Sequence, residues 1–185
     1  MRNRGESRVE WLLVAVVAVL AIGFLVWKLS AGKVPEVGET APGFSLPDQD
    51  GQAHTLERFR GKWLALYFYP RDDTPGCVRQ ACAFRDDWRT LDGMGAAVVG
   101  VSVDDVRSHG AFAKRYSLMF RLLADTTGGV ATQYGSIYNL GLFKLAKRNT
   151  FLIDPQGRIA KVYAPADAST NSQEVIRDLQ TLKRT

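Results

Sequence analysis

The residues best suited to chemistry in this chain of 185 residues are its two cysteines, Cys77 and Cys82. Both lie in the segment 70–82, PRDDTPGCVRQAC. A cysteine thiolate is a nucleophile, and it is oxidised stepwise from sulfenic acid onward. We therefore predict redox chemistry at this segment.

A predicted strand and a predicted helix flank the cysteine segment. The apolar run 63–69, WLALYFY, is typical of a buried strand. After the segment, Phe84, Trp88 and Leu91 recur at helical spacing. A cysteine at such a junction lies near the partial positive charge of a helix N-terminus, which favours the reactive thiolate. We take Cys77 as the nucleophile and Cys82 as its partner.

The spacing of five residues between the cysteines restricts how they can bond. On an unbroken α-helix the two side chains would differ by about 140° in direction and about 7.5 Å along the axis. A disulfide needs Cα atoms within roughly 7 Å and side chains that face each other. The pair is thus predicted to cycle between a folded dithiol and a locally unfolded disulfide, and Pro75 and Gly76 before the helix permit that unwinding.

Other roles for the cysteines are less consistent with the sequence. Two buried structural cysteines are disfavoured by their charged neighbours, and a static structural disulfide is disfavoured by the helical spacing. A metal site is not supported either. The only other soft ligands are His54 and His109, which lie far apart and in no ligand-spacing pattern.

The composition is that of a globular protein, with 46% apolar and 23% charged residues. The formal net charge is +5, but residues 1–33 contribute +3 of it. The other residues carry a net charge of only +2. They contain no basic run and no arginine–aromatic interleaving, so we predict no nucleic-acid binding.

The N-terminal segment contains a run of 17 uncharged residues, 11–27, with a tryptophan at each end. This pattern predicts a transmembrane anchor within residues 1–30. A buried helix and a cleaved signal peptide ending near residues 29–31 are the alternatives. Positive charge is slightly heavier before the run than after it, which predicts a cytoplasmic N-terminus and a main domain on the extracytoplasmic (periplasmic) side.

After a predicted linker, 31–42, residues 43–185 alternate between strand-like and helix-like segments. This order predicts an α/β domain whose mixed central sheet is covered by helices on both faces. The expected elements are a hairpin at 44–46 and 53–56, strands at 96–102 and 121–125, helices at 108–116, 127–134 and 172–182, a loop as far as 147, and a hairpin at 150–153 and 159–163.

The pattern Pro70-x-x-x-Thr74-x-x-Cys77 and the string YFYPRDDTPGCVRQACAFRD resemble the Q-type peroxiredoxins, also called bacterioferritin comigratory proteins. The similarity extends over about residues 35–185. It implies a thioredoxin-like fold and the reduction of hydrogen peroxide or organic hydroperoxides without metal or bound cofactor. Further matching stretches are GVSVD at 100–104, SHGAF at 108–112, LLAD at 122–125 and RNTFLID at 148–154.

The resemblance also implies roles for single residues. Cys77 would be the peroxidatic thiolate, Thr74 would hydrogen-bond it and the peroxide, and Pro70 would shield the site. Arg148 would stabilise the thiolate and polarise the peroxide, although its position beside Lys147 is also typical of a solvated charge. Gln80 stands where many relatives carry a glutamate, and it can hydrogen-bond but adds no charge.

By the same resemblance, Cys82 would resolve the Cys77 sulfenic acid as an intramolecular disulfide. A thioredoxin or thioredoxin-like dithiol would then restore both thiols, and the protein would be a monomer. Two other functions stay open. One is a membrane-anchored thiol–disulfide oxidoreductase, although such proteins normally use a Cys-x-x-Cys motif that this chain lacks. The other is a tethered binding module with structural cysteines.

Overall fold

The computed structural model of the protein describes residue 14 and residues 16–18, 32–139 and 143–184. The chain divides into two compact units, Met1–Ala31 and Gly32–Thr185. In the first unit, the four described residues are helical. The predicted anchor lies almost wholly outside the described residues and stays a prediction. Among the residues that are described, no helix has both the length and the apolar character needed to cross a membrane.

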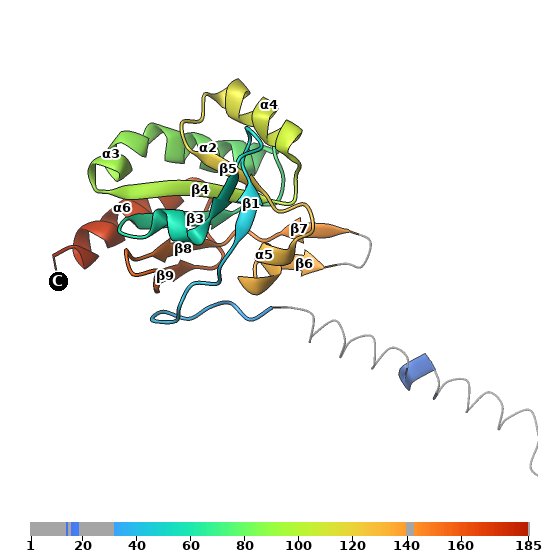
Figure 1. Ribbon diagram of the computed structural model, residues 1–185. Helices are drawn as coiled ribbons and strands as arrows, with labels where there is room; N and C mark the ends of the chain where they lie inside the picture. Colours follow the sequence, from blue (N-terminus) through green and yellow to red (C-terminus); the bar gives the residue numbers. More distant parts are fainter. Residues whose placement is uncertain (1–13, 15, 19–31, 140–142, 185) are drawn as a thin grey trace, which may run out of the picture. The chain divides into compact units, whose positions relative to one another are not determined.

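The second unit is built around a five-stranded sheet in the order β5-β4-β3-β8-β9 (Figure 1). Strand β3 lies parallel to β4, and β4 lies parallel to β5. On its other side β3 pairs antiparallel with β8, which pairs antiparallel with β9. The sheet is therefore mixed, as predicted. Its strands are β3 (Trp63–Phe68), β4 (Ala96–Ser102), β5 (Arg121–Ala124), β8 (Thr150–Ile153) and β9 (Ile159–Tyr163).

Strand β3 is apolar along its whole length because it is covered on both faces. Leu64, Leu66 and Phe68 belong to one hydrophobic cluster, whereas the alternating Ala65 and Tyr67 belong to the other. This alternation follows from the two-residue period of a strand, which sends successive side chains to opposite faces. A central strand of this kind fixes the position of the loop that leaves its C-terminal end.

One face of the sheet is covered by four helices, and α2 and α3 run along it in Figure 1. They are α2 (Pro75–Asp86), α3 (Trp88–Gly93), α4 (Val106–Tyr116) and α6 (Asn171–Leu182). The opposite face is covered by the single-turn 3₁₀ helix η1 (Leu56–Phe59), by α5 (Gly129–Gln133) and by the chain around Ala41 and Phe44. Helices thus lie on both faces, as the alternation of segments predicts.

Two short hairpins complete the unit. Strands β1 (Ser45–Pro47) and β2 (Ala53–Thr55) form the hairpin that the sequence predicts. Strands β6 (Ile137–Asn139) and β7 (Lys144–Ala146) pair antiparallel within the stretch expected as a loop. They differ from the expectation because three-residue strands are too short to show a clear alternation.

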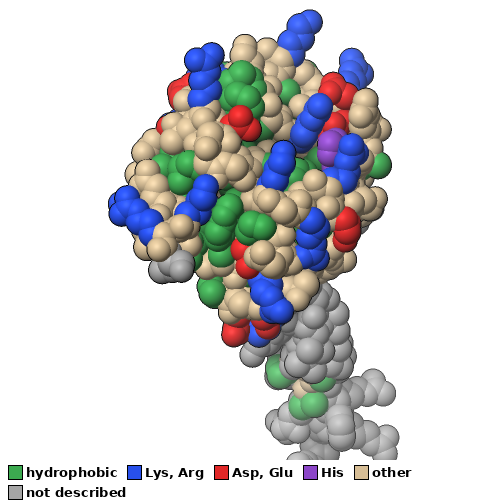
Figure 2. All heavy atoms as spheres, turned by 60° about the vertical axis from the view of Figure 1, so that its left-hand side comes forward, with side chains coloured by type: hydrophobic (Ala, Val, Ile, Leu, Met, Phe, Trp, Pro, Cys, Tyr) green, Lys and Arg blue, Asp and Glu red, His purple; other side chains and the backbone are tan. Residues whose placement is uncertain are grey.

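Part of the expected linker, 31–42, is hydrogen-bonded to the domain. The Gly38 amide donates to the Ile159 carbonyl at 2.8 Å, and the Ala41 amide donates to the Gly157 carbonyl at 2.9 Å. Ala41 is also buried in the core. On the face that Figure 2 shows, Lys and Arg side chains are scattered among apolar and acidic ones.

Candidate active site

Cys77 lies in the first turn of α2, directly after the loop that leaves β3. Thr74 occupies the N-cap position and Pro75 the first helical position. Proline fits there because its missing N–H would have no partner within the helix. Cys77 is buried, with 1% of its surface exposed, and Cys82 is partly exposed. Because α2 is continuous through both residues, both thiols are free.

The structure places Arg148, two residues before β8, against Cys77. Its Nη2 donates to Cys77 Sγ at 3.4 Å. The absence of a side chain at Gly76 permits this approach, since a Cβ there would lie 3.0 Å from Arg148 Nη2. The contact places a cation beside the sulfur, where it attracts negative charge that develops there. Arg148 is therefore not the fully solvated charge that its position beside Lys147 could also indicate.

Gln80 holds the guanidinium from its other side. Its Oε1 accepts a hydrogen bond from Arg148 Nη1 at 2.6 Å, and its Nε2 donates to Asn171 Oδ1 at 3.1 Å. The same Asn171 oxygen accepts a 2.7 Å bond from Thr150 Oγ1. Gln80 fits this arrangement, and as a neutral amide it adds no negative charge beside Arg148.

Thr74 and Pro70 lie in the loop before the helix. The Thr74 hydroxyl donates to the Arg71 carbonyl at 3.1 Å. It has a single proton, so in this arrangement it does not donate to Cys77, although its lone pairs remain able to accept. Pro70 lines a surface hollow together with Arg148. The structure therefore brings Cys77, Arg148 and Gln80 into direct contact, while Thr74 and Pro70 border them.

A buried carboxylate ties this loop to α4. Asp72 accepts hydrogen bonds from Tyr69 Oη at 2.8 Å and from Ser108 Oγ at 2.7 Å, and His109 Nδ1 lies 2.9 Å away. Burial alone would raise the pKa of Asp72, but the contacts with His109, Ser108 and Tyr69 outweigh it and lower that pKa. The ionised carboxylate thus fixes the loop against α4.

The loop is also held by its backbone. The Asp72 amide donates to Asp104 Oδ2 at 2.9 Å, and Ser102 Oγ donates to the same oxygen at 2.6 Å. The residue types alone predict no functional role for Asp72, Asp104 or His109. The only signal for them is the family match, which includes Asp72 in the string around Cys77, Asp104 at 100–104 and His109 at 108–112. Helix α4 also begins earlier than expected, at Val106, because Asp105 rather than Ser108 caps it.

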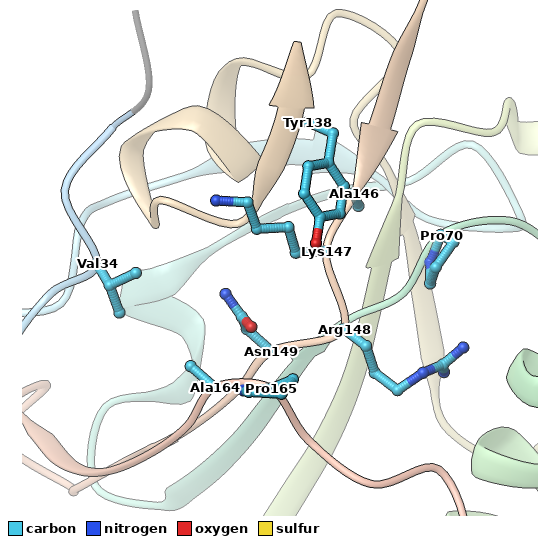
Figure 3. Close-up of a pocket in the computed structure, with 9 residues that line it drawn as sticks. All are labelled: Val34, Pro70, Tyr138, Ala146, Lys147, Arg148, Asn149, Ala164 and Pro165. Atoms are coloured by element: carbon cyan, nitrogen blue, oxygen red, sulfur yellow. The ribbon is translucent and has the colours of Figure 1, made fainter. Parts of the chain in front are cut away.

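A hollow of about 540 Å³ opens beside the guanidinium. In Figure 3 the Lys147 and Arg148 side chains leave the chain in opposite directions. Apolar groups supply much of the lining. The lining residues are Val34, Pro70, Tyr138, Ala146, Lys147, Arg148, Asn149, Ala164 and Pro165.

Comparison with known proteins identifies relatives over most of the chain. The sequence profile of the AhpC/TSA family matches residues 37–162. A putative peroxiredoxin bcp from Coxiella burnetii is 42% identical over 145 residues, which cover 76% of this chain and 96% of the relative. A chloroplastic peroxiredoxin Q from Triticum aestivum is 44% identical over 141 residues. That match covers 76% of this chain and 62% of the plant protein.

The fold is also found among solved structures. The peroxidoxin BcpB of Mycobacterium tuberculosis superposes with a TM-score of 0.76 at 32% sequence identity. The superposition covers 80% of this chain and 98% of that protein. The chain therefore has the thioredoxin-like fold that the sequence resemblance implies.

Proposed function

Because this chain belongs to the AhpC/TSA family and is a thiol-dependent peroxidase of its peroxiredoxin Q group, we propose that Cys77 attacks the peroxide and Cys82 resolves the product. The contact of Arg148 Nη2 with Cys77 Sγ at 3.4 Å carries this assignment. It pairs a cation with the sulfur that has to react as an anion.

In the first step the Cys77 thiolate attacks one oxygen of the O–O bond. That bond breaks, and its electron pair leaves with the second oxygen, which takes a proton to give water or an alcohol. Cys77 becomes a sulfenic acid, oxidised by two electrons. The Arg148 guanidinium supports the thiolate before attack, and as a fixed donor it stabilises charge on the departing oxygen.

In the second step the Cys82 sulfur bonds to the Cys77 sulfur, and the sulfenic hydroxyl leaves as water. This bond requires α2 to unwind, because the helix separates the two side chains. An external dithiol then exchanges with the disulfide, restores both thiols and becomes a disulfide itself. Thioredoxin or a thioredoxin-like protein is the proposed reductant.

The proposed substrates are hydrogen peroxide and organic hydroperoxides. Supporting the second class, the hollow of about 540 Å³ that Pro70 and Arg148 help to line has room for an organic group beside the guanidinium. Its lining combines apolar residues such as Pro165 and Ala146 with polar and charged ones, and the apolar part offers a surface for a hydrocarbon group.

The proposal is tested by following NADPH consumption with thioredoxin, thioredoxin reductase and hydrogen peroxide. We expect Cys77→Ser to reduce turnover to the uncatalysed rate. We expect Cys82→Ser to form one sulfenic acid per chain and then to stop turning over with thioredoxin. Sustained peroxide reduction by Cys77→Ser would contradict the assignment, and insulin-disulfide reduction faster than peroxide reduction would favour a protein-disulfide oxidoreductase.

A further inference from the structure

A chain of hydrogen bonds leads from Cys77 through Arg148 and Gln80 to Asn171 and Thr150. Its direction is set by chemistry, because a guanidinium can only donate. Arg148 therefore requires the oxygen of the Gln80 amide, which turns the Gln80 nitrogen toward Asn171. The Asn171 oxygen has to accept that bond, and the Thr150 hydroxyl donates to the same oxygen.

Asn171 is also a costly residue to bury at this position. Its side chain is fully buried at the first position of α6, and its Nδ2 has no hydrogen-bond partner among the described residues. A buried donor without a partner destabilises a fold. The Asn171 oxygen, in contrast, accepts two hydrogen bonds. We therefore attribute the role of Asn171 in the site to the acceptor that it presents to Gln80.

Gln80 lies between Cys77 and Cys82 on α2 and is fully buried. Unwinding of this helix segment removes Gln80 from both Asn171 and Arg148. The hydrogen bonds that orient Arg148 at Cys77 are therefore the same bonds that oppose unwinding. Gln80 therefore links two properties of the site. It supports the contact of Arg148 with Cys77, and it limits how readily Cys82 can reach Cys77.

We propose that Asn171, held by Thr150, is a positioning residue that fixes Gln80 and thereby keeps Arg148 at Cys77 while holding α2 folded. This inference rests on the proposed roles of Cys77 and Cys82. The contact has opposite effects on the two chemical steps. It speeds attack on peroxide by orienting Arg148, and it slows disulfide formation by stabilising the helix that has to unwind.

The test compares Asn171→Ala with Ser172→Ala as a matched control. Ser172 is the next residue, is equally buried, and has a hydroxyl with no hydrogen-bond partner in the described part of the chain. Step one is measured in a Cys82→Ser background, as the rate of dimedone-trapped sulfenic acid with hydrogen peroxide. Step two is measured with both cysteines present, as single-turnover disulfide formation at saturating peroxide.

For Asn171→Ala we expect step one to slow severalfold and step two to accelerate by about threefold to tenfold, in line with the loss of one buried hydrogen bond. Ser172→Ala should leave both rates within twofold of the wild type. Thr150→Val removes the donor that holds Asn171 and should change both rates in the same directions by smaller factors. It also serves as the test if Asn171→Ala does not fold.

Equal slowing of both steps, or rates that match Ser172→Ala, would overturn the role of Asn171. Absence of sulfenic acid in the Cys82→Ser background would instead overturn the proposed function of Cys77. The two failures are therefore distinguishable in the same set of measurements.

Discussion

At the scale of single residues, the environment of Cys77 depends on what is missing at Gly76. The guanidinium of Arg148 reaches the first turn of α2 through the space that a side chain at this position would occupy. Glycine is a poor helix former, so its presence in α2 weakens the helix. The position thus exchanges helix stability for a closer contact between Arg148 and Cys77.

Gly76→Ala should separate these two effects. The added Cβ would lie 3.0 Å from Arg148 Nη2, and the flexible guanidinium has to move away from it. We expect sulfenic acid formation to slow severalfold, while the free energy of unfolding rises by up to about 1 kcal/mol. Stopped-flow kinetics and urea unfolding measure the two quantities. Gly93→Ala, where a Cβ meets open space, is the control, and an unchanged rate in Gly76→Ala would contradict the argument.

Asp72 gives the catalytic loop a defined pH dependence. Its folded pKa is lowered from the ordinary value of 3.8 because, although burial opposes it, His109, Ser108 and Tyr69 stabilise the carboxylate. The unfolded chain therefore binds the proton more readily. The stabilisation is fully present above the unfolded pKa, and it is lost as the pH falls through the lower folded value.

Urea unfolding from pH 3 to pH 7 checks this sign. The difference in unfolding free energy between the wild type and Asp72→Asn should be constant above about pH 5 and should shrink below about pH 4. Asp92→Asn, at an exposed position on α3, should show no such change. A difference that grows with acidity would mean that the carboxylate is not stabilised in the fold.

At the scale of elements, β3 and β4 determine where α2 can sit. Tyr67 of β3 stacks on Phe84 of α2 with 4.9 Å between ring centroids. On the neighbouring strand, Gly100 leaves space for the phenol, since a Cβ there would lie 2.7 Å from Tyr67 Oη. The position of the cysteine helix over the sheet therefore depends on a small residue in β4.

Gly100→Ala should destabilise the domain by overpacking. The new methyl group would contact Tyr67 Oη at 2.7 Å and Leu122 Cδ2 at 2.8 Å, within a buried layer. We expect a loss of about 1–3 kcal/mol in the free energy of unfolding. Gly43→Ala, where a Cβ meets nothing within 4 Å, should change it by less than about 0.5 kcal/mol. Equal stabilities of the two variants would show that the layer can adjust.

The regular elements could be predicted because their apolar residues recur at a fixed period. Strand β4 has the predicted bounds, and α6 begins one residue earlier than expected. Strands β6 and β7 could not be predicted, since each has three residues and Tyr138 and Leu145 remain exposed. Local periodicity carries no information on such short pairings.

The candidate site could be predicted only in part. The residue type and spacing identified Cys77 and Cys82, and the family pattern added Arg148. The contact between Gln80 and Asn171 joins residues 91 positions apart, and it depends on how α6 packs against α2. Nothing in the local sequence at Asn171 indicates this contact, because an asparagine at the start of a helix ordinarily serves the helix end.

At the scale of the whole molecule, the proposed site belongs to the unit Gly32–Thr185. Among the described residues, the members of both hydrophobic clusters come from this unit, beginning at Val34. The proposed site is also contained in it, from Pro70 to Asn171. No residue proposed to react with the peroxide or to position a reacting group falls within residues 1–31. The catalytic unit is therefore expected to fold and react without them.

The final prediction separates catalysis from location. Residues 32–185 alone should reduce hydrogen peroxide with kcat/KM within about twofold of the full chain, since every proposed reacting and positioning group is retained.

The full chain should sediment with membranes and the truncated chain should not, because the uncharged run 11–27 predicts the anchor. In intact cells, a membrane-impermeant maleimide should label Cys82 of the full chain if the domain lies on the predicted extracytoplasmic side. Labelling only after lysis would reverse the topology, and a truncated chain that cannot fold would show that residues 1–31 stabilise the domain.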